Sequence, residues 1–432
     1  MSSDITPSDT QHRAIAAIRA WYEQDTEKQQ VFRLFGYAGT GKSTVLRFAL
    51  EELDLEPHRA GGDGEGCVPG VVTATFTGKA ALVLRRKGTP ARTIHSLIYS
   101  VIEATEEEVE AAEKKITEAM ASARQLSGFD RTTAEATIEA MRQAVSEMKR
   151  PRFALNPKSD AAHARLIVLD EVSMVGEDMA RDLMSFGKPI LVLGDPGQLP
   201  PIQGEGAFTK DAPDIMLTEI HRQAGESAII RLATMARQGI DIPPGEHDAH
   251  VWKLPRNAVR PDQMLRGGQV ICGRNDTRRW LNSQIKQAAG FPAPYPAGQD
   301  EKLICLKNRH DLGLVNGMFL SLADIRHESD LAFSATVTTE DGVAISGRHR
   351  FYKGHYDDHV RYDRERLTRD YREMRGLIES SWGYAITCHK AQGSQWTNVV
   401  VYDDGLSRTA EDRNRWLYTA ITRAERGLVI LD

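Results

Sequence analysis

A phosphate-binding pattern occupies residues 36–43, which fit the form G-x-x-x-x-G-K-[ST]. An apolar run precedes it at residues 31–35 and a helical pattern follows it, which is the context that this pattern requires. Glycines let backbone N–H groups surround phosphate oxygens, and the helix N-terminus adds positive potential. The sequence therefore predicts a nucleoside-triphosphate site with Mg²⁺ as cofactor, in which Lys42 reaches the β- and γ-phosphates and Ser43 binds the metal. The expected nucleotide-binding residues are Gly36, Gly39, Thr40, Gly41, Lys42, Ser43 and Thr44.

Two carboxylates follow a second apolar run, at residues 166–169. At the carboxyl end of a parallel strand, Asp170 can hold the metal, while Glu171 can orient and deprotonate the attacking water. The pattern is common by chance and gains its meaning from the phosphate-binding pattern. Together they predict nucleotide hydrolysis.

Three further side chains could act on the γ-phosphate. Gln198 follows the run at residues 190–193 and could hydrogen-bond the water or phosphate, although a solvent-facing amide in a Pro/Gly turn is the alternative. Arg222 and Arg423 could neutralise the charge that develops in the transition state, although a single arginine usually forms a surface ion pair. We expect both arginines to come from a second lobe.

Composition narrows the class of protein without naming a partner. The chain has 432 residues, of which 41% are hydrophobic and 27% charged, as in ordinary soluble globular proteins. The net charge of −5 gives no nucleic-acid signal, and no run has the length of a membrane span. The start of the chain lacks a signal-peptide pattern, and the four scattered cysteines form no C-x-x-C pair, so a cytoplasmic location is expected.

Seven apolar runs predict the strands of two parallel α/β lobes. They are residues 31–35, 71–75, 166–169 and 190–193 in the first half, and 270–272, 399–402 and 428–431 in the second. We expect an N-terminal lobe at residues 1–96 and 151–212, and a C-terminal lobe at residues 213–315 and 381–432.

Two insertions interrupt these lobes. Residues 97–150 predict a helical hairpin with capping boxes at Thr105 and Thr132 and a turn at residues 127–130. Its acidic face is either a solvated surface or a site for a protein partner. Residues 316–380 predict a small β-rich domain, with a hairpin turn at residues 341–342, and a charged helix or linker at residues 356–375.

Taken in order, these motifs resemble the superfamily 1 helicases of the RecD/Dda-like branch, which move 5′ to 3′ on single-stranded DNA. The resemblance runs from Gln11 almost to the C-terminus and weakens only in the insertions. It implies two RecA-like lobes with ATP between them, an SH3-like second insertion, an adenine-reading role for Gln11 and a nucleotide contact at Gly393. It also implies DNA contacts, on hydroxyl, imidazole and ammonium groups that suit phosphates. The expected DNA-binding residues are Phe76, Thr77, Lys79, Thr93, His95, Thr387, His389 and Lys390.

The chain departs from the family at three places. Phe76 stands where proline is usual and could stack on a base or belong to the core. Gln395 replaces a glutamate that follows motif V, and the interval that usually holds the strand-separating pin is long and helical. The expected function is an ATP-dependent DNA helicase acting on single strands and junctions. The alternatives are an RNA helicase and a nucleotide-dependent remodelling or loading factor.

Overall fold

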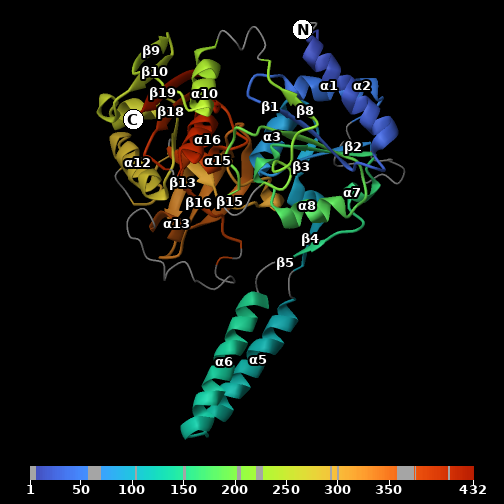
Figure 1. The fold of residues 1–432 in the computed structure, drawn as a ribbon. Helices are drawn as coiled ribbons and strands as arrows, with labels where there is room; N and C mark the ends of the chain where they lie inside the picture. Colours follow the sequence, from blue (N-terminus) through green and yellow to red (C-terminus); the bar gives the residue numbers. More distant parts are fainter. Residues whose placement is uncertain are drawn as a thin grey trace. The chain divides into compact units, whose positions relative to one another are not determined.

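The structure is a computed structural model that describes residues 6–56, 70–102, 105–148, 152–201, 206–219, 227–291, 294–298, 301–357, 374, 376–406 and 409–432. The chain forms two compact units (Figure 1). The first comprises Met1–Ile98, Pro157–Tyr362 and Ile378–Asp432, and the second comprises Tyr99–Asn156 and Asp363–Leu377. No described helix is both long enough and apolar enough to cross a membrane.

A parallel six-stranded sheet forms the core of the first lobe, in the order β3-β2-β6-β7-β1-β8. All four apolar runs predicted in this half are strands, and their side chains are almost fully buried because helices cover the sheet. The strands are β1 (Val31–Gly36), β2 (Val71–Thr75), β3 (Ala91–Thr93), β6 (Leu166–Asp170), β7 (Ile190–Gly194) and β8 (Ile215–Leu217). The helical segments are α1 (Asp9–Ala20), η1 (Trp21–Asp25), α2 (Lys42–Glu52), α3 (Gly78–Arg86), α4 (Ile94–Ile98), α7 (Asp160–His163), η2 (Val172–Met174) and α8 (Glu177–Met184).

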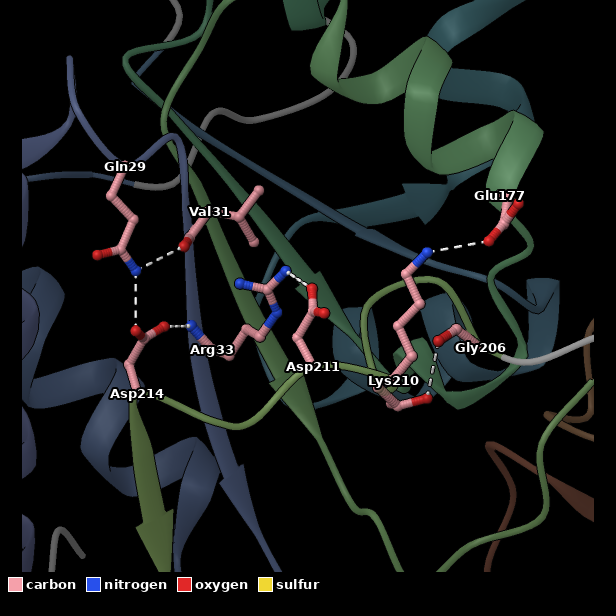
Figure 2. Close-up of polar contacts among 9 residues, drawn as sticks. Gln29, Val31, Arg33, Glu177, Gly206, Lys210, Asp211 and Asp214 are labelled. Atoms are coloured by element: carbon pink, nitrogen blue, oxygen red, sulfur yellow. Dashed lines mark hydrogen bonds and ion pairs between the residues drawn. The ribbon is translucent and has the colours of Figure 1, made fainter.

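Polar contacts tie the segment before β8 to the first lobe (Figure 2). The carboxylate of Asp214 accepts hydrogen bonds from the backbone N–H of Arg33 and the side chain of Gln29. Arg33 also pairs with Asp211 at 2.6 Å, and Lys210 pairs with Glu177 at 2.9 Å. These contacts hold β8 beside β1, so the first lobe extends past the predicted boundary at residue 212.

A second six-stranded sheet has the order β17-β11-β18-β19-β10-β9 and is parallel except at β9, which runs antiparallel to β10. The three runs predicted in this half lie in β11, β18 and β19. The strands are β9 (Gly245–Asp248), β10 (Val251–Leu254), β11 (Gln269–Cys272), β17 (Ala385–Thr387), β18 (Trp396–Tyr402) and β19 (Ala424–Leu431). The helical segments are α10 (Ala228–Gln238), η3 (Arg256–Ala258), α11 (Pro261–Arg266), α12 (Asn275–Ala288), α15 (Cys388–Ala391) and α16 (Ala410–Ile421).

An antiparallel five-stranded sheet, in the order β15-β14-β13-β12-β16, is inserted into the second lobe. The predicted hairpin is present, with Gly342 at a φ of 75° in its turn. The sheet is wider than expected, because β12 lies before residue 316 and pairs with both β13 and β16. Its elements are β12 (Leu303–Cys305), η4 (His310–Leu312), β13 (Phe319–His327), β14 (Ala332–Thr339), β15 (Ala344–Tyr352), α13 (Gly354–Asp357) and β16 (Ser380–Trp382). Most of the predicted charged stretch at residues 356–375 lies outside the described residues.

The second unit contains the predicted helical hairpin, in which α5 (Glu106–Ala123) and α6 (Gly128–Met148) lie side by side (Figure 1). At its base β4 (Tyr99–Ile102) pairs antiparallel with β5 (Arg152–Leu155). The capping box at Thr105 is confirmed. The one predicted at Thr132 is wrong, because α6 begins at Gly128 and the Thr132 hydroxyl donates to the Gly128 carbonyl inside the helix.

Candidate active site

The phosphate-binding loop joins β1 to α2 in the predicted way. Gly39 and Gly41 have φ values of 81° and 79°, which side chains rarely permit. A Cβ on Gly36 would lie 2.9 Å from the Cβ of Leu217, so only glycine fits beside β8. The Lys42 ammonium donates to the carbonyl oxygens of Gly36 and Tyr37, at 2.5 and 3.2 Å. These carbonyls hold the ammonium over the loop, where phosphate oxygens could replace them.

Gln11 connects α1 to this loop. Its Oε1 accepts a hydrogen bond from the backbone N–H of Ser8, which completes a capping box, and its Nε2 donates to the Thr40 carbonyl at 3.3 Å. The residue is 2% exposed. The amide thus positions the loop in this state, and adenine reading by Gln11 stays a prediction.

Three carboxylates lie at the carboxyl ends of β6 and β7, two neighbouring strands of which β7 pairs with β1. Asp170 ends β6, and burial, followed by the charge of Glu171, raises its pKa to about 6, while Lys42 opposes the rise. Glu171 has a φ of 55° and a ψ of 48°, a left-handed conformation that is strained for a residue with a side chain. Asp195 follows β7 and also has a raised pKa because of burial, again opposed by Lys42. Sequence reasoning did not select Asp195, although it lies beside the predicted Gln198.

Helix α16 of the second lobe reaches this site through Tyr418. The Tyr418 hydroxyl accepts a hydrogen bond from the backbone N–H of Ala38 in the phosphate loop at 2.8 Å and donates to Asp195 at 2.6 Å. Beside it is a cavity of about 260 Å³ between the loop and α10. There the Arg237 guanidinium lies 3.7 Å from the centre of the Tyr37 ring. The sequence analysis selected neither Tyr418 nor Arg237. Tyr418 lies in the segment from which only Arg423 was chosen, and Arg237 belongs to none of the recognised motifs.

The other predicted catalytic residues occupy different settings. Gln198 is 8% exposed, and its Oε1 accepts no hydrogen bond from the described residues. Arg423 is 4% exposed and donates to the carbonyls of Thr419 and Ser394, so its guanidinium is held within the second lobe. Arg222 lies outside the described residues.

The start of α3, where DNA contacts were predicted, is covered by the second lobe and its insertion. Lys79 is 6% exposed, and its ammonium pairs at 3.0 Å with Glu340 in the turn between β14 and β15. It also lies 4.3 Å from the centre of the Phe319 ring, and burial lowers its pKa. A Cβ on Gly393 would lie 2.8 Å from the Thr77 hydroxyl oxygen. Gly393 therefore packs against the start of α3 in this structure, and its contact with nucleotide stays a prediction.

The remaining predicted DNA contacts lie in the loops and short helices that follow strands. Thr77 and Thr387 cap α3 and α15 by accepting from the backbone N–H groups of Ala80 and Lys390. Phe76 is partly buried, with its ring centre 6.3 Å from that of the exposed His95. Three others have partners or surroundings of their own: Thr93 accepts from the Ser96 N–H, His389 has a pKa lowered by burial, and Lys390 donates to Asn316.

Comparison with known proteins identifies the family. A family model described as an AAA domain matches residues 8–243, more than half of the chain. The chain belongs to this family. Residues 383–431 match the UvrD-like helicase C-terminal domain, which includes both Tyr418 and Arg423. The predicted resemblance to superfamily 1 helicases of the RecD-like branch is thereby confirmed.

One curated protein and one solved structure are similar to this chain. An ATP-dependent RecD2 DNA helicase of Deinococcus radiodurans is 27% identical over 274 residues, which are 60% of this chain and 35% of the relative. The chain thus spans about a third of that relative's length. The structure of Bacteroides Pif1 bound to single-stranded DNA aligns with a TM-score of 0.50 and 16% identity over 99% of this chain and 92% of that one. This similarity supports the same fold: two lobes with parallel sheets and an antiparallel insertion.

Proposed function

We propose that this protein is an ATP-dependent DNA helicase that moves 5′ to 3′ along single-stranded DNA. The observation that carries the proposal is the position of Lys42. Its ammonium lies on the carbonyls of the phosphate loop, close enough to Asp170 and Asp195 to oppose the rise that burial causes in the pKa of both carboxyls. A cation and carboxylates meeting at the carboxyl ends of adjacent strands are what ATP with a divalent metal requires.

The side chains at the site fit Mg²⁺. Ser43 offers a hydroxyl and Asp170 a carboxylate, and hard oxygen ligands of this kind suit this ion. Burial beside Glu171 makes the ionised form of Asp170 unfavourable, and a cation would relieve that cost. No group of three or more metal-ligating side chains occurs among the described residues, which agrees with a metal held mainly by phosphates and water. Bound Mg²⁺ would neutralise charge on the phosphates.

The hydrolytic roles follow from position and chemistry. Glu171, beside Asp170, would orient the attacking water and take its proton. Arg423 would leave its contacts with Thr419 and Ser394 to neutralise the γ-phosphate, and Arg222 would act with it. Gln198 is buried, and its amide oxygen has no hydrogen-bond partner among the described residues, which suits a group that senses water or phosphate.

Movement on DNA rests on the two lobes. Hydroxyl, imidazole and ammonium groups at Thr77, Thr93, His95, Thr387, His389 and Lys390 would hold phosphates, and closure of the lobes on ATP would alternate their grip. The named activity of the RecD2 relative and the single-stranded DNA bound to Bacteroides Pif1 support DNA as the substrate. The polarity is that of the family, and a cytoplasmic location stays a prediction.

Strand displacement tests the proposal directly. The chain is mixed with duplexes that carry a single-stranded tail at either the 5′ or the 3′ end, with ATP and Mg²⁺. We expect displacement from the 5′-tailed duplex and stronger stimulation of ATP hydrolysis by single-stranded DNA than by RNA. Stimulation by RNA alone would favour an RNA helicase, because the 2′-OH is the systematic difference between the two strands. Hydrolysis without displacement from either duplex would favour a remodelling factor.

The helical hairpin gives a second arm to this test. Removing residues 103–148 leaves both strands of the β4–β5 pair in place. If the hairpin binds a protein partner, the shortened chain should keep displacement activity and lose partner capture. Loss of displacement would instead give the hairpin a part in strand separation.

A further inference from the structure

We propose that Tyr418 is a positioning residue that passes the state of the phosphate loop to the loop after β7. The inference rests on the proposed function, because it concerns the same nucleotide site. Tyr418 is 2% exposed, and its single hydroxyl joins Ala38 of the phosphate loop to Asp195. Ala38 and Asp195 both belong to the first lobe, whereas Tyr418 belongs to the second.

The loop after β7 is fixed at both ends by α16. The Asp195 carboxylate accepts one hydrogen bond from Tyr418 and another from the backbone N–H of Gly197. Four residues further on, the backbone N–H of Leu199 donates to the hydroxyl of Thr419 at 3.0 Å. Gln198 lies between these anchors, so its position depends on two neighbouring side chains of α16.

Close packing makes this arrangement sensitive to small movements. A Cβ on Gly197 would lie 2.9 Å from the Tyr418 ring, so the ring rests directly on the backbone of this loop. Among the described residues, the hydroxyl forms hydrogen bonds with Ala38 and Asp195. A shift of α16 must therefore move the loop, or break these contacts.

Competition for one N–H links this arrangement to nucleotide. Ala38 has a single backbone donor, which now points to Tyr418. N–H groups of such a loop turn toward phosphate oxygens when nucleotide binds. If Ala38 turns in this way, the Tyr418 hydroxyl loses a donor and keeps only the Asp195 carboxylate. The position of Gln198 then differs between the nucleotide-free and the nucleotide-bound states. The change is carried by the contact of Tyr418, in the second lobe, with Ala38 and Asp195, in the first.

The variant Tyr418→Phe tests the inference, because it keeps the ring that packs on Gly197 and removes only the hydroxyl. The matched control is Tyr356→Phe, which removes another buried hydroxyl, bonded to Ser380 in the inserted sheet. Steady-state hydrolysis and the Kd for a fluorescent ATP analogue are measured for each variant. We expect Tyr418→Phe to lower kcat about 10- to 100-fold, the range for losing a hydrogen bond to a charged group, with Kd changed less than about threefold. Tyr356→Phe should change neither kcat nor the Kd for the ATP analogue.

A second readout does not depend on turnover. Hydrogen exchange is followed at residues 195–199 with and without a non-hydrolysable ATP analogue. In the wild type the analogue should change protection of this loop, and in Tyr418→Phe the change should be lost. Asp195→Asn, which keeps an acceptor for Gly197, should also lose it.

The outcomes separate the two proposals. A wild type that hydrolyses no ATP refutes the proposed function, and the exchange comparison then decides on Tyr418. Unchanged kcat and unchanged exchange in Tyr418→Phe overturn the inference while leaving the helicase proposal in place. A parallel loss of kcat, nucleotide binding and thermal stability would assign Tyr418 a structural role only, and would also overturn it.

Discussion

Lys42 and Lys79 were both expected to hold phosphates, one of ATP and one of DNA, yet the structure surrounds them differently. Lys42 lies on two backbone carbonyls that carry no net charge. Lys79 is paired with the carboxylate of Glu340 and lies against the Phe319 ring. A phosphate can displace a neutral carbonyl easily, whereas at Lys79 it must compete with an existing anion.

The difference shows how far a short motif determines its surroundings. The phosphate loop is built from neighbouring residues, so its geometry follows from local sequence. The surroundings of Lys79 come from a turn 261 residues further along the chain. A motif can therefore point to a side chain while the partner of that side chain depends on an insertion.

The largest effect that separates the two lysines is expected from Lys42→Ala. This change should abolish ATP turnover with the fold intact, because the ammonium donates to the loop carbonyls of Gly36 and Tyr37 and would bind the phosphates of ATP. Lys79→Ala should keep measurable turnover, because the change removes a contact between α3 and the inserted sheet and leaves the phosphate loop as it is. Hydrolysis rates and circular dichroism of both variants check the contrast, and normal turnover by folded Lys42→Ala would refute the site.

Arg423→Ala should reduce hydrolysis by roughly 10³- to 10⁵-fold while sparing nucleotide binding, as for other arginines that neutralise a transferring phosphoryl group. Arg423→Lys should substitute poorly, because an ammonium lacks the planar fork. Arg413→Ala, on the preceding helix α16 and paired with Asp403, is the control. A loss below about tenfold, measured under saturating ATP, would remove Arg423 from the chemistry.

Glu171→Gln should bind ATP and hydrolyse it about 10²- to 10⁴-fold more slowly, because an amide cannot take the proton from water. Glu177→Gln removes an exposed carboxylate paired with Lys210 and serves as the control. Single-turnover kinetics measure the step. Retained turnover would place the base elsewhere.

Asp170→Asn should stabilise the nucleotide-free protein above pH 6. The folded-state pKa of Asp170 is raised to about 6, so the folded state binds more protons than the unfolded state, and stability falls as pH rises from about 4 to 6. Asparagine avoids this cost and can still accept the hydrogen bond from the Glu171 N–H. We expect a gain on the order of 2 kcal/mol at pH 8 and little at pH 4, measured by denaturation in EDTA. A variant less stable than wild type at pH 8 would contradict the assignment.

The smallest effect concerns the acidic turn. Replacing Glu340 with Gln and Asp341 with Asn frees both Lys79 and Arg86, which pair with these carboxylates. We expect binding of oligothymidine to tighten about two- to tenfold, in line with the modest energy of partly exposed pairs. Glu328→Gln, which breaks a pair with Arg350 in the same sheet, is the control. Unchanged or weaker binding would mean that DNA does not compete for Lys79.

Sequence patterns predicted most of this architecture because its buried strands are continuous apolar runs. All seven runs form strands, and Lys42, Asp170 and Asp195 meet because the carboxyl ends of parallel strands share one edge. Contacts between distant segments could not be predicted: Tyr418 with Ala38, Glu340 with Lys79, and Gly393 with Thr77. The start of α6 was misplaced because a threonine pattern typical of caps also fits the interior of a helix.

The pairing of β4 with β5 has a consequence for how this chain can vary. Tyr99 pairs with Leu155 and Ile102 with Arg152, so the two ends of the hairpin leave and rejoin the chain side by side. Whatever lies between them closes a loop whose entropic cost grows only slowly with length. Segments of very different size could therefore be exchanged at this pair without rebuilding either parallel sheet. The β4–β5 pair is therefore a position at which the same two lobes could carry different insertions.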